Sequence, residues 1–188
     1  HFVYKIKMKH GKVDRYKSRL VVDGSIQVQG IDYSDSFAPV VKYTTLRIFL
    51  SICVVYNMQV HQLDVESAFI YAPLTEEVYM HPHPAMNIPR GHCLRLLKSL
   101  YGLRQAPRNW NAHLHDFICS LGFQRNSLDH CLYMGTALGS TVLLAVFVDD
   151  ILIASESVSA INQIKTAFRL KTWVSPKSSS IFASLSSL

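Results

Sequence analysis

Apolar and polar positions divide this chain into segments expected to form strands and segments expected to form helices. The expected strands cover residues 2–8, 15–22, 58–65, 76–80 and 141–154. The first two form a basic β-hairpin with His10 and Gly11 in its turn. The last is itself a hairpin, whose apolar run is interrupted by Asp149 and Asp150. We therefore expect two adjacent acidic side chains at the tip of an otherwise apolar hairpin.

Apolar residues at spacings of three and four predict three helices. Their apolar faces consist of Leu46, Phe49, Leu50 and Cys53, then Trp110, Leu114, Phe117, Ile118 and Leu121, then Val158, Ile161, Ile164 and Phe168. Thr44 or Thr45 is expected to cap the first helix. Pro107 lies in the first turn of the second helix, and Gly122 ends it.

Composition fits a folded globular protein. The chain has 188 residues, of which 49% are hydrophobic and 17% charged, a balance that disordered chains do not show. This length suits one domain or two tightly joined subdomains. No apolar stretch approaches the roughly 18 residues of a membrane-spanning helix, so we expect a soluble protein.

Charge bears on the kind of partner that the chain binds, and cysteine content bears on the redox state of its surroundings. Lys and Arg number 19 against 13 acidic residues, a formal charge of +6, which suits a polyanionic partner but is also common in ordinary soluble proteins. Cys53 and Cys119 lie on apolar helical faces, where buried free thiols in a reducing intracellular setting are expected. The chain has no cysteine spacing typical of zinc, and no matching ligand set accompanies the clustered histidines. These histidines are His81, His83, His113 and His115.

The paired aspartates have two interpretations. Asp149 and Asp150 repel each other, which destabilises the tip unless a cation offsets the repulsion, although an exposed Asp-Asp turn is also possible. Asp64 favours the first interpretation because it too closes an apolar strand. Three carboxylates on adjacent strand ends suit two magnesium ions, which would activate a 3′-hydroxyl for in-line attack at an α-phosphate and stabilise the pyrophosphate leaving group.

A series of short motifs in a fixed order closely resembles the copia-type retrotransposon reverse transcriptase domain, from about Val3 to Leu170. The motifs are Gly30-Ile31-Asp32-Tyr33, Phe37-Ala38-Pro39-Val40, Gln62-Leu63-Asp64-Val65 with Ala68-Phe69, Glu77-Val78-Tyr79-Met80, Lys98 to Arg108 with Trp110, and Phe147-Val148-Asp149-Asp150. Each motif alone is a weak signal, but their joint occurrence in order is specific.

The resemblance implies an α+β fold with the fingers and palm of a right-hand polymerase, an antiparallel palm sheet packed on helices, and no thumb. It implies a fingers hairpin and linker over 1–43, a palm with part of the fingers over 44–170, and a divergent Ser-rich tail over 171–188 that is expected to be disordered. The implied activity is RNA-directed DNA polymerisation. The alternatives are an inactive remnant that still binds nucleic acid, and another palm-type enzyme such as a cyclase.

The resemblance also assigns roles to individual residues. The implied catalytic and metal-binding residues are Asp64, Asp149 and Asp150, with the carbonyl of Val65 as a further ligand of two Mg²⁺ ions that Mn²⁺ can replace. The implied nucleotide-binding residues are Lys17, Arg19, Ala68, Phe69 and Gln105, and Arg104 and Arg108 would contact nucleic acid. In the simplest alternatives, Phe69 is a core aromatic, Gln105 caps a helix and both arginines are solvated.

The implied partners are a primed RNA or DNA template, deoxynucleotides and the rest of a Pol polyprotein, with integrase upstream and RNase H downstream. The implied location is a cytoplasmic virus-like particle or the nucleus, with no membrane association. Two departures from the family matter. Asp23 stands where the family usually has lysine, which weakens phosphate attraction, and the sequence loses its likeness near Lys171. We hypothesise a frameshift or splicing error there, which the other reading frames of the encoding DNA would reveal.

Overall fold

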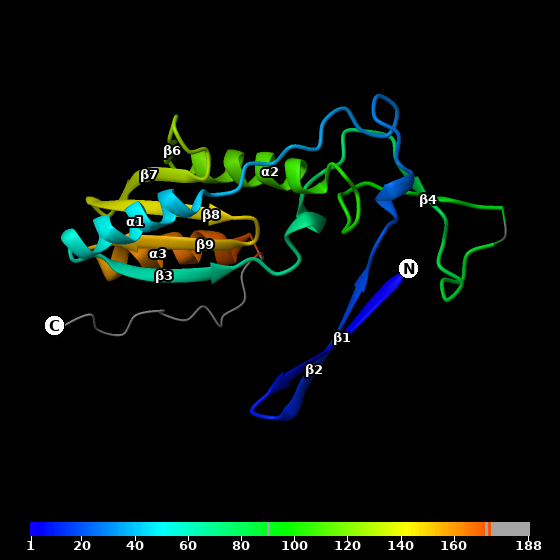
Figure 1. The fold of residues 1–188 in the computed structure, drawn as a ribbon, viewed down its shortest axis with the longest axis horizontal. Helices are drawn as coiled ribbons and strands as arrows, with labels where there is room; N and C mark the ends of the chain where they lie inside the picture. Colours follow the sequence, from blue (N-terminus) through cyan, green and yellow to red (C-terminus); the bar gives the residue numbers. More distant parts are fainter. Residues whose placement is uncertain (90, 172, 174–188) are drawn as a thin grey trace. The chain divides into compact units, whose positions relative to one another are not determined.

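The computed structural model describes residues 1–89, 91–171 and 173, and it divides the chain into two compact units (Figure 1). The first unit combines His1–Phe37 with Phe69–Trp110, and the second combines Ala38–Ala68 with the residues from Asn111 onward. Each unit is therefore assembled from two separate stretches of the sequence. The Ser-rich tail predicted beyond Lys171 lies outside the described residues except for Trp173.

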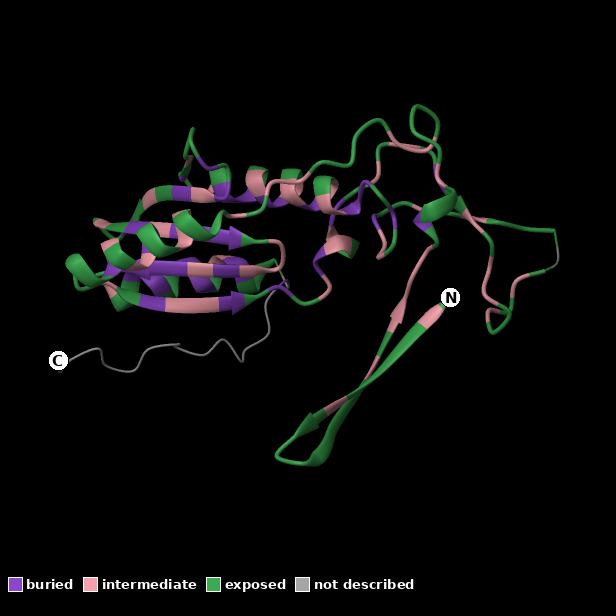
Figure 2. Ribbon diagram, viewed as in Figure 1, coloured by how far each residue is buried: buried purple, intermediate pink, exposed green. Residues whose placement is uncertain are grey.

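The first unit contains the predicted hairpin. Strand β1 (Phe2–Lys9) pairs in antiparallel fashion with β2 (Lys12–Leu20), and Figure 2 shows that the hairpin is mostly exposed. The turn residues His10 and Gly11 both have positive φ angles, of 50° and 75°. This two-residue turn geometry matches the right-handed twist of the two strands, so the hairpin prediction is confirmed.

The rest of the first unit is mostly irregular around a small apolar core. Its regular elements are the 3₁₀ helix η1 (Gly24–Ile26), most of η2 (Ala68–Tyr71), and the short strands β4 (Tyr79–Met80) and β5 (Leu94–Arg95). The strand expected over 76–80 is therefore reduced to two residues. Val78, Leu103 and Ala106 form the buried core. A Cβ atom on Gly24 would lie 2.0 Å from the carbonyl oxygen of Gly102, so this close backbone contact requires glycine.

The second unit contains a five-stranded antiparallel sheet in the order β3-β9-β8-β7-β6 (Figure 1). The strands are β3 (Gln59–Asp64), β6 (Gln124–Arg125), β7 (Leu132–Ala137), β8 (Ser140–Phe147) and β9 (Asp150–Ser155). The strand expected over 58–65 and the hairpin expected over 141–154 are confirmed. Strands β6 and β7 were not predicted, because β6 has two residues and β7 carries Gly135 and Thr136 within a weak alternation.

Three α-helices occur among the described residues, and all three were predicted: α1 (Tyr43–Val55), α2 (Ala106–Ser120) and α3 (Val158–Leu170). Phe49 and Cys53 of α1 pack against Val60 and Ala154 on one face of the sheet. On the other face, α3 contacts β3, β7, β8 and β9. The ring of Phe168 in α3 meets that of Phe117 in α2 at a centroid distance of 5.0 Å. The sheet of the second unit thus lies between two helical layers.

The start of α1 corrects the predicted cap. Lys42 occupies the N-cap position, and its side chain makes no capping bond within the described part of the chain, so the prediction of Thr44 or Thr45 as the cap is wrong. The carboxylate of Asp129 instead accepts a hydrogen bond from the Lys42 backbone N–H and another from Thr45. Burial raises the pKa of Asp129, but these hydrogen bonds and one from the Cys131 backbone outweigh burial and lower the pKa overall. A distant acid therefore stabilises this helix end.

The cysteine prediction is confirmed for one residue and wrong for the other. Cys53 is buried against the sheet, and burial raises the pKa of its thiol to about 11. Cys119 is exposed near the end of α2, with its Sγ atom 3.5 Å from Nδ1 of His115. Within the described residues, no helix combines the length and the apolar character needed to cross a membrane.

A buried lysine lies beside a histidine in the second unit. Nζ of Lys165 on α3 lies 2.7 Å from Nδ1 of His61 on β3, and Lys165 is only 6% exposed. Burial, and then the charge of Lys165, lower the pKa of His61. Burial, and then the charge of Arg169, lower the pKa of Lys165. The folded chain therefore binds a proton at His61 less readily than the unfolded chain does.

We expect the free energy of unfolding to fall as the pH drops from about 7 towards 5, because unfolded His61 protonates near pH 6.5 while folded His61 stays neutral to lower pH. His61→Gln should flatten this dependence, as measured by urea unfolding at several pH values. The control His92→Gln changes an exposed histidine and should keep the original slope. An unchanged slope in His61→Gln would contradict the assignment.

Candidate active site

Two of the three predicted acidic residues are directly opposed in the sheet. Asp64 is the last residue of β3 and Asp150 is the first residue of β9, and the two are partners in the antiparallel register. Side chains of directly opposed residues project from the same face, and their Cα atoms lie about 4.5–5.5 Å apart. The sheet therefore brings together two acids that are far apart in the sequence.

Asp149 joins the same edge through the backbone. Together with Val148 it forms the two-residue turn between β8 and β9, and its carbonyl oxygen accepts a hydrogen bond of 2.8 Å from the Val65 backbone N–H. This bond extends the pairing of β3 with β9 by one step. Asp64, Asp149 and Asp150 thus share one end of the sheet, which we call the carboxylate edge.

The side chains at the carboxylate edge differ in exposure and contacts. Asp64 is exposed, whereas Asp149 and Asp150 are half-buried. The side-chain amide of Gln62 donates a hydrogen bond of 2.7 Å to Oδ1 of Asp150. Among the described residues, no three His, Cys, Asp or Glu side chains are gathered closely enough to hold a metal ion. The carboxylates have the chemistry that Mg²⁺ prefers, although the three acids do not form a ready ligand group among the described residues.

The turn at the carboxylate edge is strained. Val148 has a φ angle of 55°, in the left-handed region that β-branched residues rarely adopt. Two-residue hairpin turns favour Asn or Gly with positive φ. The turn therefore keeps a residue that costs folding free energy, which is a frequent property of functional sites.

We expect Val148→Asn to raise the free energy of unfolding by about 1 kcal/mol, because asparagine tolerates the left-handed region. Urea unfolding of the variant would measure this gain. Leu138 has a φ of 49° in the turn between β7 and β8, so Leu138→Asn should give a similar gain. Leu128→Asn changes an exposed residue without positive φ and should give none. Equal stability of all three variants would rule out backbone strain.

In the first unit, two of the predicted nucleotide-binding residues, Arg19 and Phe69, both contact the ring of Tyr101. The guanidinium carbon of Arg19 lies 5.2 Å from the centre of the Tyr101 ring. The Tyr101 ring lies 4.9 Å from the ring of Phe69. Nε of Arg19 is buried, and among the described residues it has no hydrogen-bond partner. The structure thus joins Arg19 and Phe69 through Tyr101, a residue that we had not predicted as part of the site.

Gln105 is fully buried and bonded to two loop residues of the first unit. Its side-chain oxygen accepts a hydrogen bond of 3.1 Å from Gln27, and its side-chain nitrogen donates one of 3.0 Å to the Asp32 carbonyl. Its backbone carbonyl accepts a bond from the Asn109 N–H at the start of α2. The side chain therefore does not cap the helix but ties it to the loop.

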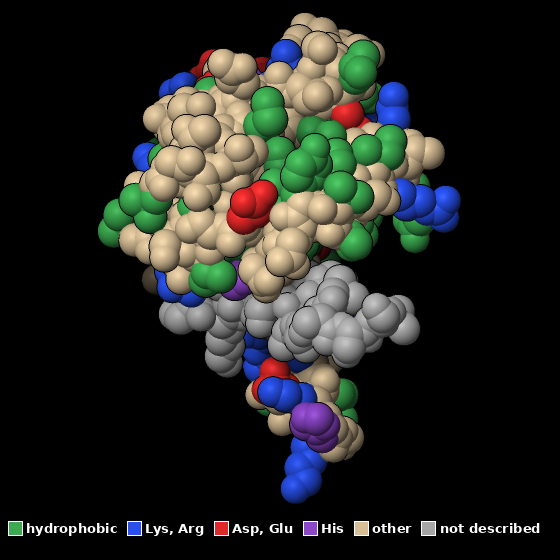
Figure 3. All heavy atoms as spheres, turned by 90° about the vertical axis from the view of Figure 1, so that its left-hand side faces the viewer, with side chains coloured by type: hydrophobic (Ala, Val, Ile, Leu, Met, Phe, Trp, Pro, Cys, Tyr) green, Lys and Arg blue, Asp and Glu red, His purple; other side chains and the backbone are tan. Residues whose placement is uncertain are grey.

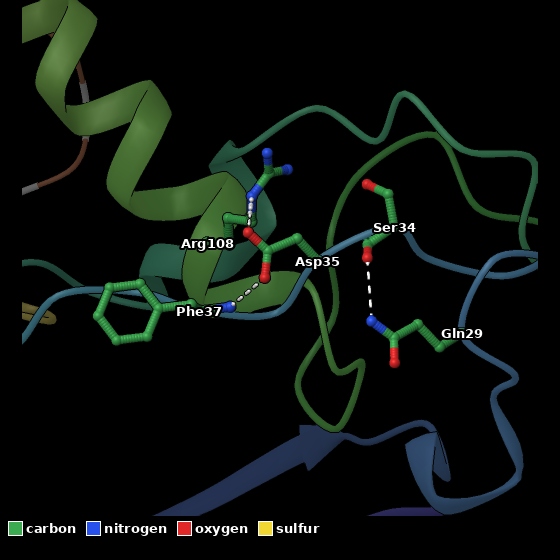
Figure 4. Close-up of polar contacts among 5 residues, drawn as sticks. All are labelled: Gln29, Ser34, Asp35, Phe37 and Arg108. Carbon is green, nitrogen blue, oxygen red and sulfur yellow. Dashed lines mark hydrogen bonds and ion pairs between the residues drawn. The ribbon is translucent and has the colours of Figure 1, made fainter.

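The two predicted nucleic-acid contacts both have protein partners. Nε of Arg104 donates to the Gly24 carbonyl at 2.9 Å. Nε of Arg108 lies 3.4 Å from Asp35, whose other carboxylate oxygen accepts a hydrogen bond from the Phe37 backbone N–H (Figure 4). Arg108 remains partly exposed, so this pair contributes little to stability.

The remaining predicted residues occupy ordinary positions in their elements. Lys17 lies on β2 opposite Lys5, and Ala68 is buried at the start of η2. Asp23, which departs from the family pattern, caps η1 by accepting hydrogen bonds from the backbone N–H and hydroxyl of Ser25. These hydrogen bonds lower the pKa of Asp23. The departure therefore has a local structural role.

Gln62 and Tyr101 are the site residues that sequence reasoning missed. Gln62 lies two positions before Asp64 on a strand, so period-2 alternation already places both side chains on one face. Tyr101 had no comparable signal, because its contacts with Arg19 and Phe69 join distant segments. A separate groove of about 430 Å³ lies between α1 and strands β6, β7 and β8, and none of the described residues that line it is a predicted site residue.

The comparisons with known proteins agree with the ordered motifs. The chain matches the family described as reverse transcriptase (RNA-dependent DNA polymerase) over residues 1–177. It is 41% identical over 146 residues to the retrovirus-related Pol polyprotein from transposon RE1 of Arabidopsis thaliana, covering 76% of this chain and 10% of that protein. It is 38% identical over 169 residues to that from transposon TNT 1-94 of Nicotiana tabacum, covering 87% and 13%. No solved structure matches.

These relatives are much longer proteins, since the matched region spans only 10% and 13% of their lengths. The family match covers most of this chain and includes both the acidic hairpin and the β1–β2 hairpin. The chain therefore belongs to the reverse transcriptase (RNA-dependent DNA polymerase) family, as found in the Pol polyproteins of copia-type transposons.

Proposed function

We propose that this chain forms the fingers and palm of an RNA-directed DNA polymerase, with the fingers hairpin and linker over 1–43 and the palm over 44–170. The reaction joins a deoxynucleotide to a primer 3′-hydroxyl. One observation carries the proposal: Asp64 is paired with Asp150, and the neighbouring Val65 N–H is bonded to the Asp149 carbonyl. This pairing brings three acidic residues to one end of the sheet, which supports the proposal.

The carboxylates would hold two Mg²⁺ ions, or Mn²⁺ in their place. Asp64, Asp149 and Asp150 supply hard oxygen ligands, and the Val65 carbonyl supplies another. When bound, the ions activate the primer hydroxyl and stabilise the pyrophosphate leaving group. Because the described residues contain no ready group of three such ligands, holding the ions would require side-chain rotation at the carboxylate edge. The hydrogen bond from Gln62 orients Asp150 for this role.

All the residues proposed to select the nucleotide belong to the first unit except Ala68, the last residue of the first segment of the second unit. Arg19 and Lys17 contact the triphosphate, while Ala68, Phe69 and Gln105 line the sugar. The Tyr101 ring lies against both Arg19 and Phe69, so it holds the cation and the aromatic ring in a fixed relation. Arg104 and Arg108 contact phosphates of the primer or template, which fixes register without reading sequence.

The partners proposed for the chain are a primed RNA or DNA template, deoxynucleotides and the remainder of a Pol polyprotein. The relatives are named as Pol polyproteins, which supports the last of these. The proposed location is a virus-like particle in the cytoplasm, or the nucleus. We also propose that a frameshift or splicing error near Lys171 produced the Ser-rich tail.

A primer-extension assay on an RNA template tests the function. The unmodified chain should extend the primer with deoxynucleotides and Mg²⁺, stop when a chelator removes the metal, and resume when Mg²⁺ is restored. Asp149→Asn should not extend the primer. Asp23 in place of a lysine favours a second candidate function, an inactive remnant that binds nucleic acid. Template binding without extension by either chain would support the remnant.

We expect Phe69→Val to increase incorporation of ribonucleotides relative to deoxynucleotides by about 10-fold to 100-fold, because a smaller side chain no longer excludes the 2′-hydroxyl. The ratio of kcat/KM values for the two substrates measures this change. Phe37→Val alters an exposed phenylalanine of the same unit and should leave the ratio unchanged. Tyr101→Leu, which removes the ring that supports Phe69, should have a smaller effect. An unchanged ratio for Phe69→Val would refute the assigned role.

A further inference from the structure

Two of the residues proposed to bind nucleotide and nucleic acid are bonded to one loop of the same unit, residues 24–35, which we call the acceptor loop. Nε of Arg104 donates a hydrogen bond of 2.9 Å to the Gly24 carbonyl. The side-chain nitrogen of Gln105 donates one of 3.0 Å to the Asp32 carbonyl. A phosphate oxygen or a sugar hydroxyl would offer these donors the same kind of acceptor. The acceptor loop therefore uses the donors that the ligands are proposed to bind.

The acceptor loop makes a third contact of this kind, an ion pair between Asp35 and Arg108 (Figure 4). Nε of Arg108 lies 3.4 Å from one carboxylate oxygen of Asp35, and the other oxygen accepts a hydrogen bond of 3.1 Å from the Phe37 backbone N–H. The bond from Phe37, one from Ser36 and the charge of Arg108 outweigh desolvation and lower the pKa of Asp35. The carboxylate is therefore charged at neutral pH and takes the place of a phosphate beside Arg108.

Gln27 attaches the acceptor loop to two successive residues. Its side-chain oxygen accepts a hydrogen bond of 2.8 Å from the Arg104 backbone N–H, and its side-chain nitrogen donates one of 3.1 Å to the side-chain oxygen of Gln105. Gln105 is 0% exposed, so a nucleotide sugar cannot reach its amide while these contacts persist. Part of the acceptor loop has to move before Gln105 can contact a nucleotide.

The middle of the acceptor loop is held together by bonds of its own. The Val28 backbone N–H donates a hydrogen bond of 2.7 Å to the carboxylate of Asp32. The side chain of Gln29 donates one of 3.3 Å to the Ser34 carbonyl (Figure 4). These bonds do not involve residues 104–108, so the loop can keep them when its contacts with those residues break.

We propose that the acceptor loop is autoinhibitory, because its carbonyl and carboxylate oxygens occupy the donors of residues 104–108 until the phosphates of a primer–template and the sugar of a deoxynucleotide displace them. The inference rests on the proposed function, which supplies the ligands of Arg104, Gln105 and Arg108. It goes further because it makes binding depend on release of the loop. An exposed ion pair such as that of Arg108 is weak, whereas arginine can bind phosphate through two parallel hydrogen bonds, so a phosphate can displace the carboxylate.

Fluorescence anisotropy of a labelled RNA–DNA primer–template on the full chain, without divalent cations, tests the proposal. Asp35→Asn removes the charge beside Arg108 but keeps an oxygen for the Phe37 N–H, so the loop should stay folded. We expect the affinity to rise about two-fold to five-fold, as release of one exposed ion pair allows. The matched control is Glu77→Gln, since Glu77 lies 3.9 Å from Arg95 in another exposed pair of the same unit. It should change the affinity less than about 1.5-fold.

A second substitution shows whether the gain depends on Arg108. In an Arg108→Gln background, Asp35→Asn should no longer tighten binding, because the two residues act through one contact. The chain carries a formal charge of +6, and Lys and Arg side chains (blue) are spread over the face shown in Figure 3. An equal gain in that background, or in Glu77→Gln, would therefore mean that only net charge matters. Either result, or no gain in Asp35→Asn, overturns the proposal.

Gln27→Ala tests the effect of the acceptor loop on the nucleotide. We expect the KM for deoxynucleotide to fall about two-fold to three-fold at unchanged kcat, because a larger fraction of the chains has Gln105 accessible. The thermal stability should fall, since two hydrogen bonds are lost. A purely structural role would instead raise KM or lower kcat together with the stability, which would contradict the proposal. The binding measurements need neither metal nor catalysis, so a chain that never extends a primer would refute the proposed function while the Asp35 test still decides this inference.

Discussion

Replacing Asp150 with asparagine is expected to lower the rate of primer extension by about three orders of magnitude or more, equivalent to roughly 4 kcal/mol. The fold should survive, because the amide oxygen of asparagine can still accept the hydrogen bond that Gln62 donates to Oδ1 of Asp150. What disappears is the negative charge that a divalent cation requires. Single-turnover extension with saturating deoxynucleotide measures the loss, and thermal unfolding verifies that the chain is folded.

The control for this experiment is Glu156→Gln. Glu156 is exposed and lies just beyond the other end of β9, so the substitution makes the same change from carboxylate to amide away from the carboxylate edge. It should leave extension within two-fold of the unmodified chain, since surface substitutions of this kind have small effects. Extension by Asp150→Asn at the rate of the control would refute the assignment of Asp150, whatever its position in the sheet.

Sequence reasoning predicted the elements that depend on short-range patterns. The hairpin that carries Asp149 and Asp150 was found because its two apolar arms are separated only by the acidic pair, and strand pairing then fixes the tip. The strand that ends at Asp64 was found in the same way. Their direct pairing required the fold, because β3 and β9 are neighbours in the sheet but distant in the sequence.

Contacts between distant residues account for most of what the sequence did not reveal. Asp129 accepts a hydrogen bond from the Lys42 backbone, 87 residues away, so the local Ser/Thr rule for helix caps chose the wrong residue. Gln105 is bonded to Gln27 and Asp32, which are 78 and 73 residues away. A glutamine at the start of a helix gives no sign of such partners. The division into two units could not be predicted for the same reason, because each unit combines two stretches that are separate in the sequence.

The second large effect is expected on stability, from substitution of Trp173. Trp173 lies where the likeness to the family was expected to end, yet its side chain is only 4% exposed. Its ring centre lies 4.9 Å from that of Phe117, 6.5 Å from that of Phe168 and 5.2 Å from that of His113. Its backbone carbonyl accepts a hydrogen bond of 2.9 Å from the Glu66 N–H. The residue thus connects the helical layer to the chain just beyond Asp64.

We expect Trp173→Ala to lower the free energy of unfolding by about 3–5 kcal/mol, the usual cost of removing a buried aromatic side chain and leaving a cavity. Trp173→Phe should recover part of this loss, because a smaller ring still fills much of the space. Urea unfolding measures both changes. Leu170→Ala alters an 81% exposed residue at the end of α3 and should cost less than about 0.5 kcal/mol.

Substitution of Trp173 should also affect the position of Asp64 at the carboxylate edge. The Val65 N–H is bonded to Asp149 and the adjacent Glu66 N–H to Trp173, so two successive backbone bonds fix the chain that leaves β3. Weakening the second bond frees the strand end that positions Asp64, and we expect Trp173→Phe to lower the rate of primer extension more than Leu170→Ala does. Equal stability of Trp173→Ala and Leu170→Ala would mean that the residue does not belong to the core, and the connection to Asp64 would then be lost as well.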